Sequence, residues 1–279
     1  MTNSKIIYDN LIHHLRLNEP EDEVSAIAFE VLDHFGISKT DIIAQKATGF
    51  NYEQLHPLIE RLNNHEPVQY ILGTAWFCGY KFSVNPSVLI PRPETEMLVE
   101  EAIKFKSSNK EFSILDIGTG SGCIAISLAL MFPEAQVMAI DVSEAALAVA
   151  KHNANKLNAH VNFVNLDILS NDLPNHSFDL IVSNPPYIGA SEMSTISKNV
   201  LDYEPHLALF VKEPDPLVFY RAISNMVTKN LNAGGEVLVE INERFGPEIK
   251  SIFKTSGLSH CQILMDLSGK NRIVRALKI

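Results

Sequence analysis

Positions 183–187, Ser-Asn-Pro-Pro-Tyr, have the residue types and spacing that point most directly to chemistry in this sequence. They follow an apolar stretch that predicts a strand, and the two prolines stiffen the backbone and leave carbonyl oxygens that no local N–H claims. The Asn184 side-chain oxygen and the Pro185 carbonyl oxygen are suited to accept both hydrogens of a substrate nitrogen. Its lone pair would then point toward a methyl sulfonium. The Tyr187 ring is suited to pack on a flat substrate group.

We therefore predict Asn184, Pro185 and Tyr187 as catalytic residues of a methyl transfer to nitrogen. The predicted substrate-binding residues are Asn184, Pro185, Pro186 and Tyr187. The motif indicates a class of nucleophile rather than one substrate, because Asn-Pro-Pro-Tyr occurs both in DNA adenine-amino methyltransferases and in protein glutamine methyltransferases. A turn of purely structural use is the alternative for this segment.

A glycine-rich turn lies upstream, after a predicted strand over 113–117 and before a predicted helix. Glycines let the backbone turn sharply and approach a ligand, and the N-terminal amides of the helix face that ligand. The turn differs from the GxGxxG dinucleotide fingerprint, because Cys-Ile-Ala-Ile follows its third glycine directly. It resembles motif I of S-adenosylmethionine-dependent methyltransferases, so we predict S-adenosylmethionine as the cofactor. The predicted contacts in this turn are Gly118, Thr119, Gly120, Ser121 and Gly122. A plain turn is the alternative.

Two acidic residues follow the next predicted strands. Asp141 lies about twenty residues after the glycine turn, where a carboxylate accepts hydrogen bonds from both hydroxyls of a ribose. Asp141 is also a candidate N-cap for a helix starting at Val142. Asp167 holds the analogous place for contact with an adenine amino group, with Ile168 as its apolar neighbour. We add Asp141, Asp167, Ile168 and Asn184 to the predicted cofactor-binding residues.

Strand-like and helix-like segments alternate from residue 112 onward, which predicts an α/β fold with a parallel sheet covered by helices on both faces. A hairpin around Ser268-Gly-Lys-Asn271 should then close the sheet with an antiparallel strand at its edge. The expected strands are 113–117, 136–141, 161–165, 178–183 and 236–241, and the expected helices are 122–131, 143–157, 216–231 and 247–256.

The first 65 residues carry apolar side chains at a period of about 3.6, which predicts four short amphipathic helices. From Val68 the aromatic-rich pattern favours a β-hairpin. We therefore expect a helical substrate-docking domain over 1–75, a β-hairpin linker over 76–90 and a methyltransferase domain over 91–279.

Residues 90–96, Ile-Pro-Arg-Pro-Glu-Thr-Glu, are predicted as an extended segment leading into a helix. They suit a rigid linker, or a site in which Glu94 and Glu96 lie beside the cationic end of the cofactor and Arg92 braces the cleft. Glu240 ends a predicted core strand, where an unpaired carboxylate is costly to bury. We expect it to pair with a basic residue.

Composition excludes several classes of protein. The 279 residues carry a formal net charge of −10, and no basic run marks a nucleic-acid backbone site. The three cysteines form no CxxC, the ten histidines show no metal-ligand spacing, and no apolar stretch reaches the roughly 20 residues of a membrane span. The first residues lack the pattern of a secretory signal. We expect a cytoplasmic, metal-free monomer that binds neither membranes nor nucleic acid directly.

Five segments together resemble the peptide chain release factor glutamine N5-methyltransferase family. They are Ile90–Glu96, Asp116–Gly122, Ser183–Ile188, Tyr203-Glu-Pro205 and Asp266–Arg272, and the resemblance extends over essentially the whole chain. It implies a Rossmann-like class I S-adenosylmethionine-dependent methyltransferase sheet, a small all-α N-terminal domain and a linking β-hairpin.

The resemblance also implies the reaction. The methyl group of S-adenosylmethionine would pass to the side-chain amide N5 of the glutamine in the Gly-Gly-Gln motif of class I peptide chain release factors, which tunes translation termination. Two alternatives stay open. One is a DNA adenine-N6 methyltransferase, which would need a basic groove and would flip its target base out of the duplex. The other is a catalytically silent module that only binds the cofactor.

Overall fold

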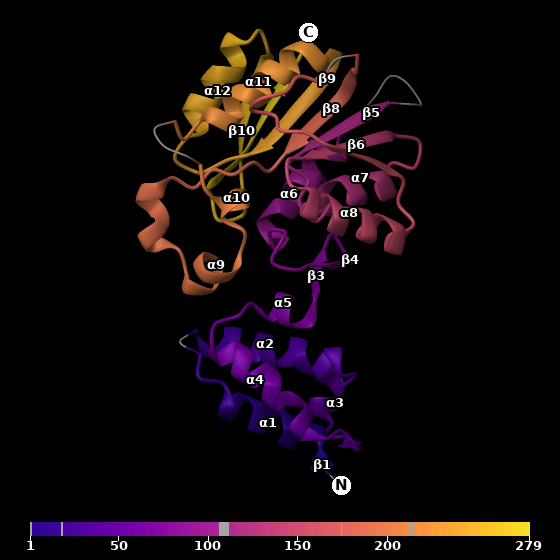
Figure 1. The fold of residues 1–279 in the computed structure, drawn as a ribbon, viewed down its shortest axis with the longest axis vertical. Helices are drawn as coiled ribbons and strands as arrows, with labels where there is room; N and C mark the ends of the chain where they lie inside the picture. Colours follow the sequence, from indigo (N-terminus) through magenta and orange to yellow (C-terminus); the bar gives the residue numbers. More distant parts are fainter. Residues whose placement is uncertain (1, 18, 106–111, 174, 212–214) are drawn as a thin grey trace. The chain divides into compact units, whose positions relative to one another are not determined.

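The computed structural model of the protein describes residues 2–17, 19–105, 112–173, 175–211 and 215–279 (Figure 1). The chain divides into two compact units. The smaller comprises residues 1–74 and 197–203, and the larger comprises 75–196 and 204–279. The predicted domain limits at residues 75 and 90 stay a proposal, although the hairpin expected between them is part of the larger unit.

The smaller unit is helical, as predicted. Its helices are α1 (Ser4–His14), α2 (Glu21–His34), α3 (Lys39–Ile43), α4 (His56–Asn63), α5 (Val68–Leu72) and α9 (Lys198–Tyr203), with a 3-10 turn over Tyr52–Leu55 and a two-residue pairing of β1 (Thr2–Asn3) with β2 (Ala47–Thr48). Ile7, Leu32 and Leu62 lie in its apolar core. Ser38 caps α3 through a 3.1 Å hydrogen bond from the Asp41 N–H.

The expectation of a β-hairpin from Val68 onward is wrong for the first five residues, which form α5. Pro67 precedes the helix, where its missing N–H costs nothing, and Gly73 ends it at a φ of 68°. The hairpin itself consists of β3 (Thr74–Phe77) and β4 (Tyr80–Ser83), joined by a turn at Cys78-Gly79 with positive φ at both residues.

A seven-stranded sheet forms the centre of the larger unit. Its strands are β5 (Ser113–Ile117), β6 (Gln136–Asp141), β7 (Val161–Asn165), β8 (Phe178–Ser183), β9 (Leu231–Glu240), β10 (Ser259–Met265) and β11 (Asn271–Leu277). They are arranged in the order β10-β11-β9-β8-β5-β6-β7. The five strands from β9 to β7 run parallel, whereas β11 is antiparallel to β9 and to the edge strand β10. The predicted parallel sheet with a closing hairpin is confirmed.

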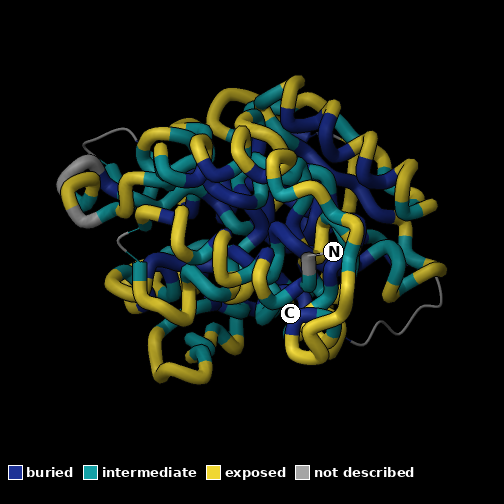
Figure 2. The backbone as a smooth tube through the Cα atoms, turned by 90° about the horizontal axis from the view of Figure 1, so that it is seen from below, coloured by how far each residue is buried: buried dark blue, intermediate teal, exposed yellow. Residues whose placement is uncertain are grey.

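Helices cover both faces of this sheet, as the alternating pattern predicts. Successive strand residues face opposite sides, so Ile114 lies in one apolar core and Leu115 in the other. The first core is closed by α6 (Pro93–Ala102), α7 (Cys123–Met131), α8 (Glu144–Leu157) and the hairpin, and the second by α11 (Val218–Asn230) and α12 (Gly246–Thr255). Figure 2 shows the buried segments in dark blue.

The strand order reverses beside β5. The chain proceeds from β5 to β6 and β7 on one side and then returns to β8 and β9 on the other. Loops leaving the carboxyl ends of β5 and β8 therefore separate, and such a switch point is where open parallel sheets bind ligands. No helix in the described part of the chain combines the length and apolar character of a membrane span.

Candidate functional site

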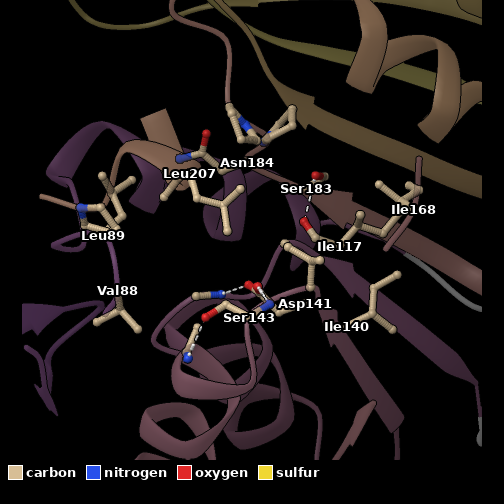
Figure 3. A pocket seen from close by; sticks show the side chains of 18 of the residues that line it. Val88, Leu89, Ile117, Ile140, Asp141, Ser143, Ile168, Ser183, Asn184 and Leu207 are labelled. Carbon is tan, nitrogen blue, oxygen red and sulfur yellow. Dashed lines mark hydrogen bonds between the residues drawn. The ribbon is translucent and has the colours of Figure 1, made fainter. Parts of the chain in front are cut away.

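A cavity of about 280 Å³ lies at the carboxyl ends of the parallel strands (Figure 3). Its walls come from the loops after β5, β6, β7 and β8, from residues 87–89 before α6, from the surroundings of the short helix α10 (His206–Leu209), and from α11. Eight of the predicted site residues line it: Gly118, Gly120, Asp141, Asp167, Ile168, Asn184, Pro185 and Pro186. Thr119, Ser121, Gly122 and Tyr187 do not.

The glycine turn contributes its backbone to the cavity. Gly118 and Gly120 have φ angles of 74° and 56°, a region that favours glycine, and both line the cavity. Gly122 serves helix packing instead. A Cβ atom there would lie 2.8 Å from Ile126 Cδ1 and 3.1 Å from Ala150 Cβ, so only glycine lets α7 and α8 approach this closely.

Thr119 and Ser121 face the interior beneath the turn. The Thr119 hydroxyl donates a 2.6 Å hydrogen bond to Asp116 Oδ2, and the Ser121 carbonyl oxygen accepts one of 2.9 Å from Asn153. Asp116 also accepts a 3.2 Å bond from the Ala125 N–H. Thr119 and Ser121 thus hold the turn in place. Asp116, two positions before Gly118, anchors the turn, a role that was not predicted from the sequence.

Asp116 should make stability depend on pH. Complete burial raises its pKa from 3.8 to about 7. Between pH 4 and pH 7 the folded protein keeps a proton that the unfolded chain has released, so stability is lost as pH rises through this window. The melting temperature of Asp116→Asn is to be compared with that of the unaltered protein at the same pH. The variant should gain several degrees relative to the unaltered protein between pH 5 and pH 8, because only the unaltered protein loses this stability. Thermal unfolding without ligand measures this difference, and a constant difference would contradict the assignment.

Asp141 joins the end of β6 to the glycine turn. Its carboxylate accepts 2.9 Å hydrogen bonds from the N–H groups of Gly120 and Ser143, and burial raises its pKa. The alternative that Asp141 caps the following helix is wrong. The helix α8 starts at Glu144, and the Ser143 hydroxyl accepts its capping bond from Ala146. Asp141 lines the cavity beside Ser143, and Figure 3 shows the pair across from Asn184.

Asp167 and Ile168 form the part of the wall that follows β7. The Asp167 carboxylate accepts hydrogen bonds from the Leu169 N–H at 2.9 Å and the Ser170 hydroxyl at 2.8 Å, which shape a local turn. Ile168 contributes an apolar surface, and Phe219 of α11 adds to the same lining. The structure therefore provides a mainly apolar compartment at the position where an adenine contact is predicted.

The first three residues of the Asn-Pro-Pro-Tyr segment face the cavity, and the fourth packs against the core. Asn184, Pro185 and Pro186 line the cavity, and the Asn184 Nδ2 group donates a 3.0 Å hydrogen bond to Thr95 Oγ1. The Tyr187 side chain packs against the core near α11, and its hydroxyl donates to Glu240 Oε1 at 3.3 Å. The structure thus does not bring Tyr187 to the cavity wall, and its predicted contact with a flat substrate group stays a prediction.

The expected basic partner of Glu240 is Arg272, whose charge lowers the Glu240 pKa without forming a direct ion pair. The Glu240 carboxylate accepts hydrogen bonds from the hydroxyls of Thr95 and Tyr187, and no described cation lies within ion-pair distance of it. Burial has the larger effect and raises the Glu240 pKa overall. Hydroxyl groups satisfy this carboxylate because β9 ends among α6 and the segment after β8, which supply neutral donors.

An ion pair fastens two of the cavity walls together. Arg92 contacts Glu204, whose side chain is only 1% exposed, and the Ile90 N–H donates a 3.2 Å bond to the same carboxylate. Residues 87–89 and 205–208, which flank these partners, both contribute to the lining. Arg92 therefore braces the cleft, as one interpretation of the sequence suggested. Glu96 instead accepts a 2.7 Å bond from the Cys78 N–H in the hairpin.

Sequence analysis missed the apolar residues Val88, Leu89 and Leu207, which line the cavity opposite the sheet. Leu207 is 60% exposed, so its side chain is accessible to a ligand in the cavity. The available signal was their position beside the proline motifs at 90–93 and 203–205. No cluster of metal-ligating side chains occurs among the described residues.

Two protein families match parts of this chain, and several curated proteins match it over most of its length. Residues 94–204 match the family described as Methyltransferase small domain, and residues 11–73 match the PrmC N-terminal domain. The chain is 42% identical over 262 residues to the release factor glutamine methyltransferase of Flavobacterium psychrophilum, covering 91% of this chain and 92% of the relative. The enzyme of the same name from Bacteroides thetaiotaomicron is also 42% identical, with 92% and 94% covered.

Among solved structures, a methyltransferase from Pyrococcus furiosus superimposes with a TM-score of 0.53 at 20% identity. The match covers 82% of this chain and 99% of that protein. At this identity the likeness establishes the fold alone, and that fold is the Rossmann-like methyltransferase sheet expected from the sequence.

Proposed function

This chain belongs to the release factor glutamine methyltransferase family, and on that premise we propose that it methylates class I peptide chain release factors. The methyl group of S-adenosylmethionine passes to the side-chain amide N5 of the glutamine in their Gly-Gly-Gln motif. One observation carries the proposal. The cavity that holds the glycine turn and Asp141 also holds Asn184 and Pro185, so cofactor and amide would meet in one compartment.

The residues lining the cavity fit S-adenosylmethionine. Gly118 and Gly120 leave the backbone open to close approach, Asp141 offers a carboxylate to ribose hydroxyls, and Ile168 belongs to an apolar wall suited to adenine. The cofactor supplies an electrophilic methyl group on a sulfonium. The protein has to hold the two reactants in line and exclude water, which accounts for the mainly apolar lining.

The chain's own contribution to the reaction is orientation of the amide. The Asn184 Oδ1 atom and the Pro185 carbonyl oxygen accept the two amide hydrogens, so the nitrogen lone pair points toward the methyl group. Methyl transfer would form the N–C bond as the C–S bond breaks, and the methylated nitrogen would lose one proton to solvent once it leaves the cavity. Because proton loss follows methyl transfer, the site requires no strong general base.

Asp141→Ala should weaken S-adenosylmethionine binding by ~1.5–3 kcal/mol, or roughly 10- to 150-fold, because charge-assisted hydrogen bonds to the ribose are lost. The bond that holds the Gly120 N–H is lost as well. Isothermal titration calorimetry measures the dissociation constant. Asp172→Ala is the matched control, since this exposed carboxylate pairs with Lys229 outside the cavity lining. An unchanged dissociation constant for Asp141→Ala would remove Asp141 from the cofactor site.

Mass spectrometry of purified release factors tests the function directly. After incubation with the protein and isotope-labelled S-adenosylmethionine, we expect one added methyl group on the glutamine of Gly-Gly-Gln. A release factor in which this glutamine is replaced by glutamate serves as the control and should gain none. Absence of the methyl group from the unaltered factor would overturn the proposal, and would leave a catalytically silent module as the better interpretation.

Double-stranded DNA should be neither bound at physiological salt nor methylated. The net charge of −10 opposes approach to a phosphate backbone. Gel shifts across salt concentrations and label incorporation into an adenine-containing duplex check this expectation. Incorporation at a rate like that into a release factor would favour the adenine-N6 methyltransferase instead. We further propose that the protein works as a monomer in the cytoplasm, where its release-factor substrates act.

A further inference from the structure

We propose that Thr95 and Glu240 are positioning residues that determine which end of the Asn184 side-chain amide faces the substrate. The inference rests on the proposed function and concerns how the acceptor at the reacting nitrogen is held. It assigns a role to a buried carboxylate that the methyl-transfer step itself does not use.

The three residues form a chain of hydrogen bonds with a fixed direction. The Asn184 Nδ2 group donates to Thr95 Oγ1 at 3.0 Å, and the Thr95 hydroxyl donates to Glu240 Oε2 at 2.7 Å. Thr95 is 3% exposed and Glu240 is 2% exposed, so water does not replace either partner. The chain leads from the core to the cavity wall at Asn184.

The direction of this chain follows from the number of protons available. A hydroxyl has one hydrogen, and an ionised carboxylate only accepts. Because the hydroxyl hydrogen of Thr95 is donated to Glu240, the Thr95 oxygen can only accept a hydrogen bond from Asn184. Asn184 must then direct its NH₂ group toward Thr95. A rotation of the amide by 180° would place Asn184 Oδ1 next to Thr95 Oγ1 with no hydrogen between the two oxygens. The Oδ1 atom of Asn184 is thereby left for the substrate amide.

Glu240 acts on both ends of the Asn-Pro-Pro-Tyr segment. Its second oxygen, Oε1, accepts the Tyr187 hydroxyl at 3.3 Å, and its backbone carbonyl oxygen accepts the Tyr220 hydroxyl at 3.1 Å. Burial raises the pKa of Glu240, and the hydrogen bonds from Thr95 and Tyr187 together with the charge of Arg272 oppose that rise. One carboxylate thus links the first turn of α6, the end of β9 and the loop after β8.

Packing alone does not explain this arrangement. Burying a carboxylate and a hydroxyl costs free energy that apolar side chains of similar size would not incur. The hydrogen-bonded set lies where it holds the amide of Asn184 in a single orientation. We therefore assign it a role in catalysis through Asn184 rather than in stability.

Thr95→Val and Thr95→Ser together test the proposal. Valine keeps the shape and removes the hydroxyl, so the single-turnover rate of release-factor methylation should fall about 10- to 100-fold as Asn184 loses its fixed orientation. Serine keeps the hydroxyl and should retain at least about half of the rate. The dissociation constants of cofactor and release factor should change less than about twofold in both variants, which a general loss of structure would not allow.

Two further variants separate this role from a structural one. Thr228→Val makes the same chemical change in α11, where the hydroxyl donates to the Ser224 carbonyl oxygen, and should leave the rate unchanged. Glu240→Met removes both acceptor oxygens, so the Thr95 hydroxyl loses the partner that fixes its hydrogen, and the rate should fall while circular dichroism stays native. An unaltered rate in Thr95→Val, or an equal loss in Thr95→Ser, would overturn the inference while leaving the proposed function intact.

A measurement that does not depend on activity tests the positioning role even if the protein transfers no methyl group. The Asn184 side-chain NH₂ signals in a ¹H–¹⁵N spectrum, assigned with Asn184→Asp, should exchange slowly in the unaltered protein and in Thr95→Ser. They should exchange faster in Thr95→Val. Equal exchange in all three proteins would overturn the positioning role, whereas absence of methylation alone would overturn only the proposed function.

Discussion

Asn184→Ala is expected to lower the single-turnover rate of methyl transfer by about 100- to 1,000-fold, which corresponds to roughly 3–4 kcal/mol of transition-state stabilisation. The side-chain oxygen of Asn184 is an acceptor held in place before the reaction begins, since its NH₂ group is bonded to Thr95. Alanine removes this acceptor and leaves the amide nitrogen of the substrate free to rotate out of line.

Binding should survive this change. The glycine turn and Asp141 remain in place for the cofactor, and a protein substrate makes many contacts away from its reacting glutamine. Single-turnover methylation, cofactor titration and pull-down of the release factor measure the three properties separately. Asn232→Ala is the control, because this asparagine donates to Asp179 and does not line the cavity. A near-normal rate in Asn184→Ala would show that Asn184 only shapes the turn and has no catalytic role.

Arg92→Ala is expected to lower the free energy of unfolding by about 3 kcal/mol, because it leaves the Glu204 carboxylate buried without its cation. The Glu204 side chain is 1% exposed and the Arg92 side chain 32% exposed. The remaining bond from the Ile90 N–H does not neutralise the charge. The residues beside both partners line the cavity, so catalysis should weaken along with stability.

Urea unfolding measures this effect. The double variant Arg92→Met with Glu204→Gln should recover most of the lost stability, because it removes the buried charge together with its partner. Lys229→Ala breaks an ion pair between side chains that are 56% and 70% exposed, and should cost less than about 1 kcal/mol. If Arg92→Ala and Lys229→Ala have equal effects, the Arg92–Glu204 pair does not hold the cavity walls together.

The sheet was predictable because its signals are local. Strands β5, β6, β7 and β8 have the expected bounds. β5, β6 and β8 are short, mostly buried apolar runs, whereas β7 lies at the edge of the sheet and has no buried residue. Residues 68–72 show the limit of such signals. Their aromatic and aliphatic side chains suit a strand, yet the surrounding Pro67 and Gly73 allow one short helix.

The site was predictable where a motif directly follows a strand. The glycine turn and the Asn-Pro-Pro segment reach the cavity because the carboxyl ends of parallel strands lie at one edge of the sheet. The motifs did not reveal which members face the ligand. Gly122 contacts α8 and Tyr187 turns toward the core, and neither contact is encoded in the adjoining residues.

The sequence by itself determined the nitrogen-methylating chemistry, the cofactor and the order of the sheet strands along the chain, since these depend on short motifs and on hydrophobic periodicity. Only the tertiary structure decided how the reacting groups are held. Thr95 and Asn184 are 89 residues apart, Thr95 and Glu240 are 145 apart, and Arg92 and Glu204 are 112 apart. Contacts over such separations leave no local pattern, because they depend on how α6, β9 and the loops after β8 pack around the same cavity.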